Sequence, residues 1–177
     1  MKLVLLLGAV LLTACTPVEE AIPGDSALSY IAEHTEHGFD DANLTWEAME
    51  ARLDRGETIS IACGHVSMLG VRKMKELGIK ARRVSTRGFG TEPGNEGASH
   101  TLMEVWRNDH WELYDLDLNR RPVYSDGRGM SLQEFSDVRK TGEFRYEILA
   151  DDTGISDGEV ERFYDAAIGV IVAEEPI

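Results

Sequence analysis

Apolar residues recur at helical spacing in five parts of the chain, and residues that start or stop helices flank these parts. Ser131 and Ser156 are each followed three residues later by a glutamate, which is the capping box of a helix N-terminus. Gly78 stands where a helix that begins at Cys63 would end. Helices are therefore predicted over residues 26–37, 44–55, 63–77, 131–139 and 156–168.

Polar and apolar residues alternate in other parts, which predicts strands. The clearest pair covers residues 99–106 and 111–118, joined by a turn with Asn108-Asp109 at its centre. Helices that precede mostly antiparallel strands predict one α+β domain over residues 25–170, followed by a frayed tail at residues 171–177. Further strands are predicted over residues 58–62, 79–86 and 143–149.

The first residues have a different pattern, a continuous apolar run after Lys2 that leads into small residues and Cys15. This predicts a signal peptide over residues 1–14, because the run is too short to span a bilayer, which takes ~20 apolar residues. The stretch LLTAC resembles the lipobox of bacterial lipoproteins, which implies that Cys15 becomes a diacylated N-terminus. Residues 15–24 would then tether an exported domain to a bacterial membrane, in the periplasm or cell envelope. The alternative is an ordinary signal peptide with a chance cysteine.

Composition narrows the classes of partner. The 177 residues carry a formal net charge of −14, whereas nucleic acids and anionic lipid surfaces are bound through basic faces. No nucleic-acid partner is therefore expected.

The chain has two cysteines, so a lipid on Cys15 would leave Cys63 as a free thiol in an oxidising compartment. Such a thiol is either a small buried apolar group or a reactive one.

The predicted hairpin brings a histidine near two carboxylates. Pairing around the turn places His100 directly opposite Asp117 and diagonal to Asp115, and the register alone does not choose between them. A carboxylate that orients a histidine is half of a nucleophilic apparatus. Cys63 fits the other half, because the unpaired N–H groups of a helix start stabilise a thiolate and an oxyanion.

These segments resemble the transglutaminase-like branch of the papain-like cysteine enzymes. The residues that carry the resemblance cover about residues 56–117: Cys63-Gly64, then Leu77-Gly78-Ile79 and an arginine-bearing strand, then His100-x-x-x-Glu104-Val105, then Trp111-x-x-x-Asp115. The resemblance implies a nucleophile helix packed on an antiparallel sheet. It also implies Cys63 as nucleophile, His100 as base and Asp115 as the third member. The family's proline after the aspartate is replaced here by Leu116, so the resemblance does not specify the substrate pocket.

Four further residues are expected to line that pocket or to support the triad: Gly64, His65, Trp111 and Asp117. Trp111 is also expected to pack across the hairpin against Trp106. The remaining histidines, His34, His37 and His110, are expected at the surface, and neither a metal nor a cofactor is implied.

The expected activity is acyl transfer at an amide of a peptide or protein in the cell envelope. Water as acceptor makes a peptidase or amidase, and an amine makes a cross-linking enzyme. The alternative is a non-catalytic scaffold of the same fold that binds a peptide or an envelope partner.

Overall fold

A computed structural model of the chain describes residues 24–87, 99–150, 155–167 and 170–175. The expected signal peptide and all but the last residue of the expected tether lie outside these ranges. No helix within the described ranges has the length and hydrophobicity needed to cross a bilayer.

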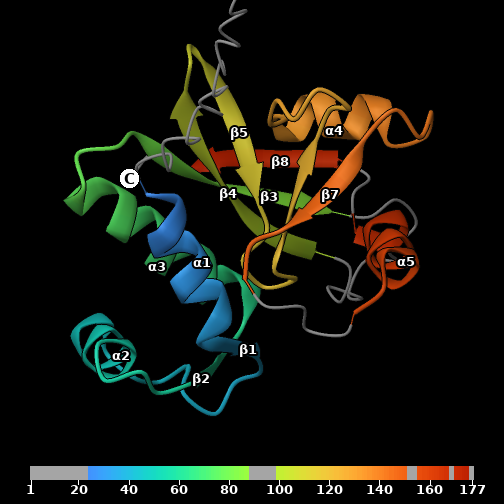
Figure 1. Ribbon diagram of the computed structural model, residues 1–177. Helices are drawn as coiled ribbons and strands as arrows, with labels where there is room; N and C mark the ends of the chain where they lie inside the picture. Colours follow the sequence, from blue (N-terminus) through green and yellow to red (C-terminus); the bar gives the residue numbers. More distant parts are fainter. Residues whose placement is uncertain (1–23, 88–98, 151–154, 168–169, 176–177) are drawn as a thin grey trace, which may run out of the picture.

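Four antiparallel strands form the central sheet, in the order β5-β4-β3-β8 (Figure 1). Trp106 pairs with Trp111, as the alternation predicted. Asn108 and Asp109 have φ of 47° and 64°, which a two-residue type I′ turn requires. The predicted register of the hairpin is thus confirmed. The strands are β3 (Ala81–Arg87), β4 (Ser99–Arg107), β5 (His110–Tyr114) and β8 (Val170–Glu175).

Two predictions are wrong, one about the end of a strand and one about the C-terminal tail. β5 ends at Tyr114 and not at residue 118, because the chain turns back there: Asp115 and Arg120 exchange backbone hydrogen bonds of 2.8 and 2.9 Å. Residues 171–175, expected in a frayed tail, belong to β8 and pair with β3. The hydrogen bonds to β3 are long-range, so the local sequence gives no sign of them.

α3 (Cys63–Glu76) packs on one face of the sheet beside α1 (Asp25–Glu33), as Figure 1 shows. Gly70 allows this close approach. A Cβ at this position would overlap Met103 Sδ and lie 2.7 Å from Leu116 Cδ1. The prediction that a helix starting at Cys63 packs on an antiparallel sheet is confirmed. The core on this face includes Leu28, Ile31, Val66, Leu69, Met74, Met103 and Val105.

Two short parallel strands, β1 (Thr35–His37) and β2 (Ile59–Ile61), lie next to α2 (Trp46–Leu53). The first helix was predicted to run to residue 37, but it ends at Glu33. The residues after it have no apolar side chain to bury on a helix face. Their backbone pairs with the buried strand β2 instead, which carries His37 toward the end of the central sheet.

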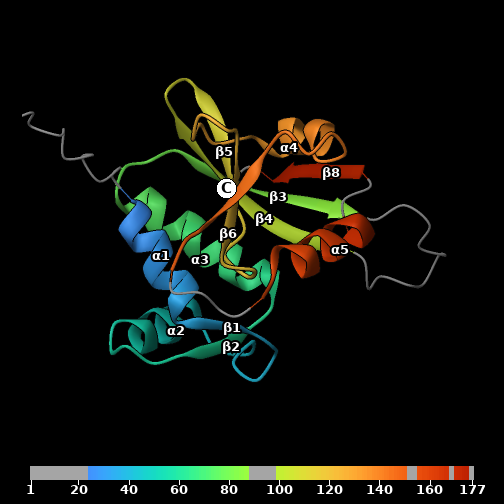
Figure 2. The same cartoon turned by 45° about the vertical axis from the view of Figure 1, so that its right-hand side comes forward.

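The opposite face of the sheet is covered by α4 (Leu132–Val138) and α5 (Asp157–Ala167) (Figures 1 and 2). Both predicted capping boxes are confirmed, with Ser131 and Ser156 bonded to the glutamates three residues on. A small sheet of β6 (Arg120–Val123) and β7 (Arg145–Ile148) lies between these helices, and β6 was not predicted. The core on this face includes Val84, Leu102, Leu113, Phe135, Val160 and Tyr164.

Candidate active site

Cys63 is the first residue of α3 and is partly buried as a free thiol. The residue before it, Ala62, is extended and gives the helix no side-chain cap. Alanine is a poor N-cap, so the first N–H groups of this helix remain for another acceptor. Ser67 Oγ donates to the carbonyl of Thr101 at 2.8 Å, which fixes the first turns of α3 against β4.

His100 lies on β4 and is 1% exposed. Its Nε2 lies 2.7 Å from Asp115 Oδ2. An ionised carboxylate accepts from Nε2–H, so Nδ1 is the nitrogen left for the hydrogen bond that joins His100 to Cys63. The ring of Phe163 packs edge-on against the imidazole, with 4.8 Å between the ring centroids. His100 thus stands between the thiol and a buried carboxylate.

The Asp115 side chain is fully buried, and its carboxylate accepts hydrogen bonds from His100, Tyr164 and Leu118. His100 occupies Oδ2 together with the hydroxyl of Tyr164, which donates at 2.5 Å. The backbone N–H of Leu118 donates to Oδ1 at 3.0 Å. A buried carboxylate is tolerated when hydrogen bonds satisfy it, so these contacts hold Asp115 ionised behind the imidazole.

The pKa shifts follow from these contacts. Burial alone would lower the pKa of His100, but the charge of Asp115, its hydrogen bond and the neighbouring Cys63 raise it to about 10. Burial opposes ionisation of Cys63, yet the hydrogen bond and charge of His100 and the N–H of Thr101 lower the net pKa of the thiol. The pKa of Asp115 is also lowered despite its burial, chiefly by the charge of His100. The contact with His100 therefore favours the ionised thiol, and the contact with Asp115 favours the imidazolium.

Asp117 joins this cluster on the side of the thiol. One atom each of Cys63 (Sγ), His100 (a ring nitrogen) and Asp117 (a carboxylate oxygen) all lie within 4.8 Å of one another. The Asp117 side chain is 5% exposed, and both of its oxygens contact Nδ1 of His37, at 2.9 and 3.1 Å. Burial raises the pKa of Asp117, and the charge of Asp115 raises it further. The register had left both aspartates as partners of His100, and the structure places Asp115 on Nε2.

The other predicted pocket residues divide into two groups. Gly64 follows Cys63, and a Cβ on it would meet no described atom outside its chain neighbours and its own helix backbone within 4 Å, so the described residues leave open space at Gly64. His65 is half-buried, with its ring 5.8 Å from that of Trp46. Trp111 is not part of the cluster. It pairs with Trp106, six positions beyond His100 on β4, which is about 20 Å at ~3.3 Å per residue.

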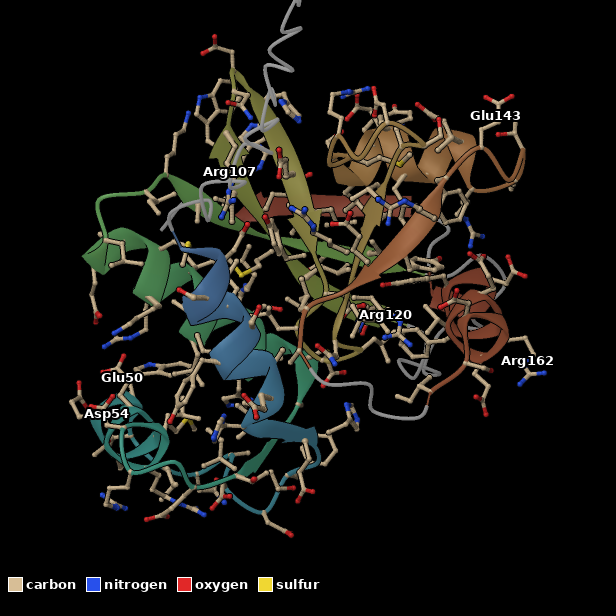
Figure 3. All side chains as sticks on the ribbon, viewed as in Figure 1. Glu50, Asp54, Arg107, Arg120, Glu143 and Arg162 are labelled. Atoms are coloured by element: carbon tan, nitrogen blue, oxygen red, sulfur yellow. The ribbon has the colours of Figure 1, made fainter. Side chains whose placement is uncertain are left out.

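Sequence reasoning missed the contribution of α5 to the site. Tyr164 lies 49 residues from Asp115, and its helical spacing from Val160 indicated only an apolar face. Arg120 holds the start of this helix and lies between the sheet and α5 (Figure 3). Its Nη2 donates to the carbonyl of Ile155 at 2.6 Å, and its Nε lies 3.7 Å from Asp157 Oδ1.

His37 was also missed as a member of the site. Its ring is 60% exposed, as expected for a surface histidine, but one edge contacts Asp117. Only the pairing of β1 with β2 brings it there, and no spacing in the sequence shows that pairing.

Comparison with known proteins gives a limited set of similarities. No protein-family model matches the chain, and no curated protein matches it. Among solved structures, the chain is similar to a "TGase", with 21% identity and a TM-score of 0.33 over 50% of this chain and 24% of that chain. It is also similar to "a Putative Cysteine Protease from Cytophaga hutchinsonii", with 15% identity and a TM-score of 0.38 over 76% of this chain and 47% of that chain. The chain thus spans about a quarter of the first protein and about half of the second. The helices and sheets of the described residues form the predicted α+β class of architecture.

Proposed function

We propose that the chain catalyses thiol-dependent acyl transfer at an amide, with Cys63 as nucleophile, His100 as acid and base, and Asp115 as the group that orients His100. One observation carries the proposal. A buried imidazole is hydrogen-bonded to a thiol at a helix start and, 2.7 Å away on its other nitrogen, to a buried carboxylate. The contact with His100 lowers the pKa of the thiol in spite of its burial, which is what a nucleophile at neutral pH needs.

The chemistry proceeds in two steps. The Cys63 thiolate attacks the carbonyl carbon, and the backbone N–H groups at the start of α3 stabilise the oxyanion. His100 gives its proton to the departing amine, the C–N bond breaks, and a thioester remains on Cys63. Water or a second amine then attacks the thioester while His100 takes its proton, which frees the thiolate and the product.

The open space beside Gly64 is where we place the acyl group of the substrate. The acyl acceptor determines whether the net reaction is hydrolysis or cross-linking, and the side chains around Cys63 are compatible with either. The proposed substrate is a peptide or protein of the cell envelope, and a lipid on Cys15 would hold the enzyme at the membrane.

The direct test is to detect the thioester. The full chain, carrying Cys15→Ser to remove the second thiol, is incubated with an amide-rich protein such as casein. Intact-mass spectrometry then looks for an acyl adduct on Cys63, and a fluorescent primary amine reports transfer. We expect an adduct that His100→Gln and Asp115→Asn reduce and that the exposed control Asp54→Asn leaves unchanged. If Cys63 reacts with a thiol reagent but no variant, the parent included, forms an acyl adduct with an amide, the result would favour the non-catalytic scaffold.

Anchoring is tested separately. We expect the unmodified chain to sediment with membranes when expressed in a lipoprotein-processing bacterium and to carry acyl chains on the peptide that begins at Cys15. Cys15→Ser should release it to the soluble fraction. Equal sedimentation of the two proteins, with no acyl mass, would contradict the lipid anchor.

A further inference from the structure

Three types of metal ligand meet at the start of α3. The Cys63 thiolate, a His100 ring nitrogen and an Asp117 carboxylate oxygen all lie within 4.8 Å of one another, and no other such group of three occurs in the described ranges. We propose that this cluster binds one Zn²⁺ ion and that bound zinc removes the thiolate from acyl transfer. The site would then be switched off by a divalent transition metal.

The set of donors fits zinc. Zn²⁺ binds cysteine sulfur, histidine nitrogen and aspartate oxygen, and three protein ligands with one open position are a common arrangement. Bonds of about 2.0–2.3 Å at tetrahedral angles place ligand atoms about 3.4–3.7 Å apart. The upper limit of 4.8 Å in the cluster therefore requires each side chain to move by about 1 Å or less, which χ rotations supply.

Groups behind the ligands already have the orientation that a metal site needs. Metal-bound histidines commonly donate their second ring N–H to a carboxylate, and His100 does so to Asp115 at 2.7 Å. The ligating carboxylate is also held, since Asp117 accepts from His37 at 2.9 Å. Two of the three ligands are thus fixed by partners outside the cluster.

Asp117 is the residue that distinguishes a metal site from a simple triad. Acyl transfer needs Cys63, His100 and Asp115, and the negative charge of Asp117 works against the thiolate by raising its pKa. A cation bound between Asp117 and Cys63 would reverse this repulsion. The acyl-transfer mechanism assigns no task to a buried carboxylate at this place, whereas metal binding does.

The proton balance is simple. Zinc binds cysteine as the thiolate and histidine through a nitrogen without a proton. The one proton that Cys63 and this His100 nitrogen hold between them therefore leaves to solvent, and nothing is oxidised or reduced. Titrations in buffers of different ionisation enthalpy measure this release.

The experiment uses Co²⁺ as a spectroscopic probe and Zn²⁺ as a competitor, on the full chain carrying Cys15→Ser. We expect one Co²⁺ per chain, a near-ultraviolet sulfur-to-cobalt band, and its loss on addition of one equivalent of Zn²⁺. Cys63→Ser should remove the band. Asp117→Asn, which keeps the size of the side chain, should weaken Zn²⁺ binding at least tenfold, and Asp54→Asn should not change it. Far-ultraviolet circular dichroism and thermal unfolding check that each variant is folded.

Several results would overturn the proposal. These are equal Zn²⁺ affinity of Asp117→Asn and the parent protein, a cobalt band that survives Cys63→Ser, or no binding above the level of the Cys63→Ser protein. The metal readouts need no substrate. They therefore stand even where no amide is turned over, and amide turnover without a cobalt band would refute only the zinc site.

Discussion

The hydrogen bond from Tyr164 to Asp115 gives a quantitative prediction about how the site is held together. Tyr164→Phe removes only the hydroxyl that donates to Asp115 Oδ2 at 2.5 Å and keeps the ring among its aromatic neighbours. Both residues are fully buried. A hydrogen bond to a charged group contributes about 1.5–3 kcal/mol, so we expect the free energy of unfolding at pH 7 to fall by about 2 kcal/mol.

The pH dependence of this loss identifies its cause. Burial raises the pKa of Asp115, but the charge and hydrogen bond of His100 and the hydroxyl of Tyr164 lower it below its ordinary value. A lowered carboxyl pKa contributes stability that is present above the unfolded value of about 3.9 and is lost as the pH falls through the folded value. The effect of Tyr164→Phe should therefore be equal at pH 7 and pH 5, and any decline, as at pH 3.5, should begin only below the unfolded value.

Urea unfolding at these three pH values measures the effect, with Tyr30→Phe as the matched control. Tyr30 donates to the neutral carbonyl of Leu53 at 2.5 Å, so its loss should cost about 0.5–1.5 kcal/mol with no such decline at acid pH. A loss below about 0.5 kcal/mol for Tyr164→Phe at pH 7, or a loss that is already smaller at pH 5 than at pH 7, would refute an ionised Asp115 bonded to Tyr164.

Three further substitutions test the site and the helix that carries it. Asp115→Asn removes the strongest influence that raises the pKa of His100 from 6.5 to about 10. Burial should then leave the imidazole neutral at pH 7, so alkylation of Cys63 should slow at least tenfold. An unchanged alkylation rate would contradict this. Gly70→Ala places a Cβ against Met103 and Leu116 and should destabilise the fold by about 1–3 kcal/mol in thermal unfolding, in spite of the better helix propensity of alanine. Gly64→Ala meets no described atom, so its melting temperature should not fall, while thioester formation on Cys63 should slow if the acyl group occupies that space. A large loss of stability in Gly64→Ala, or none in Gly70→Ala, would show that the helix packs differently.

Local signals in the sequence predicted the elements that carry the nucleophile and the histidine. Strict alternation on both sides of Asn108-Asp109 fixes one register, because a slip by one residue would turn every side chain to the wrong face. The helix at Cys63 follows from the change of period and from Gly78, whose φ of 73° favours a residue without Cβ.

The contacts that complete the site could not be predicted in this way. The choice between Asp115 and Asp117 depends on where β5 ends, which depends on the backbone bonds to Arg120. Tyr164 and His37 arrive on segments whose placement is decided by tertiary pairing. Trp111, expected near the pocket, pairs with Trp106 at the turn end of the hairpin, whereas His100 lies toward the other end of β4.

The central claim is that His100 holds the Cys63 thiol ionised, and alkylation of Cys63 as a function of pH tests it most directly. Iodoacetamide labelling is followed by mass spectrometry of the Cys63 peptide in the full chain, with wild-type His100 and with His100→Gln. The wild-type rate should rise with an inflection below the ordinary thiol value of about 8.5, because the imidazolium outweighs burial. In His100→Gln no imidazolium offsets the burial of the thiol, so the inflection should move to the ordinary thiol value of about 8.5 or above it. The same inflection in both proteins, or no labelling of either until it unfolds, would contradict the account.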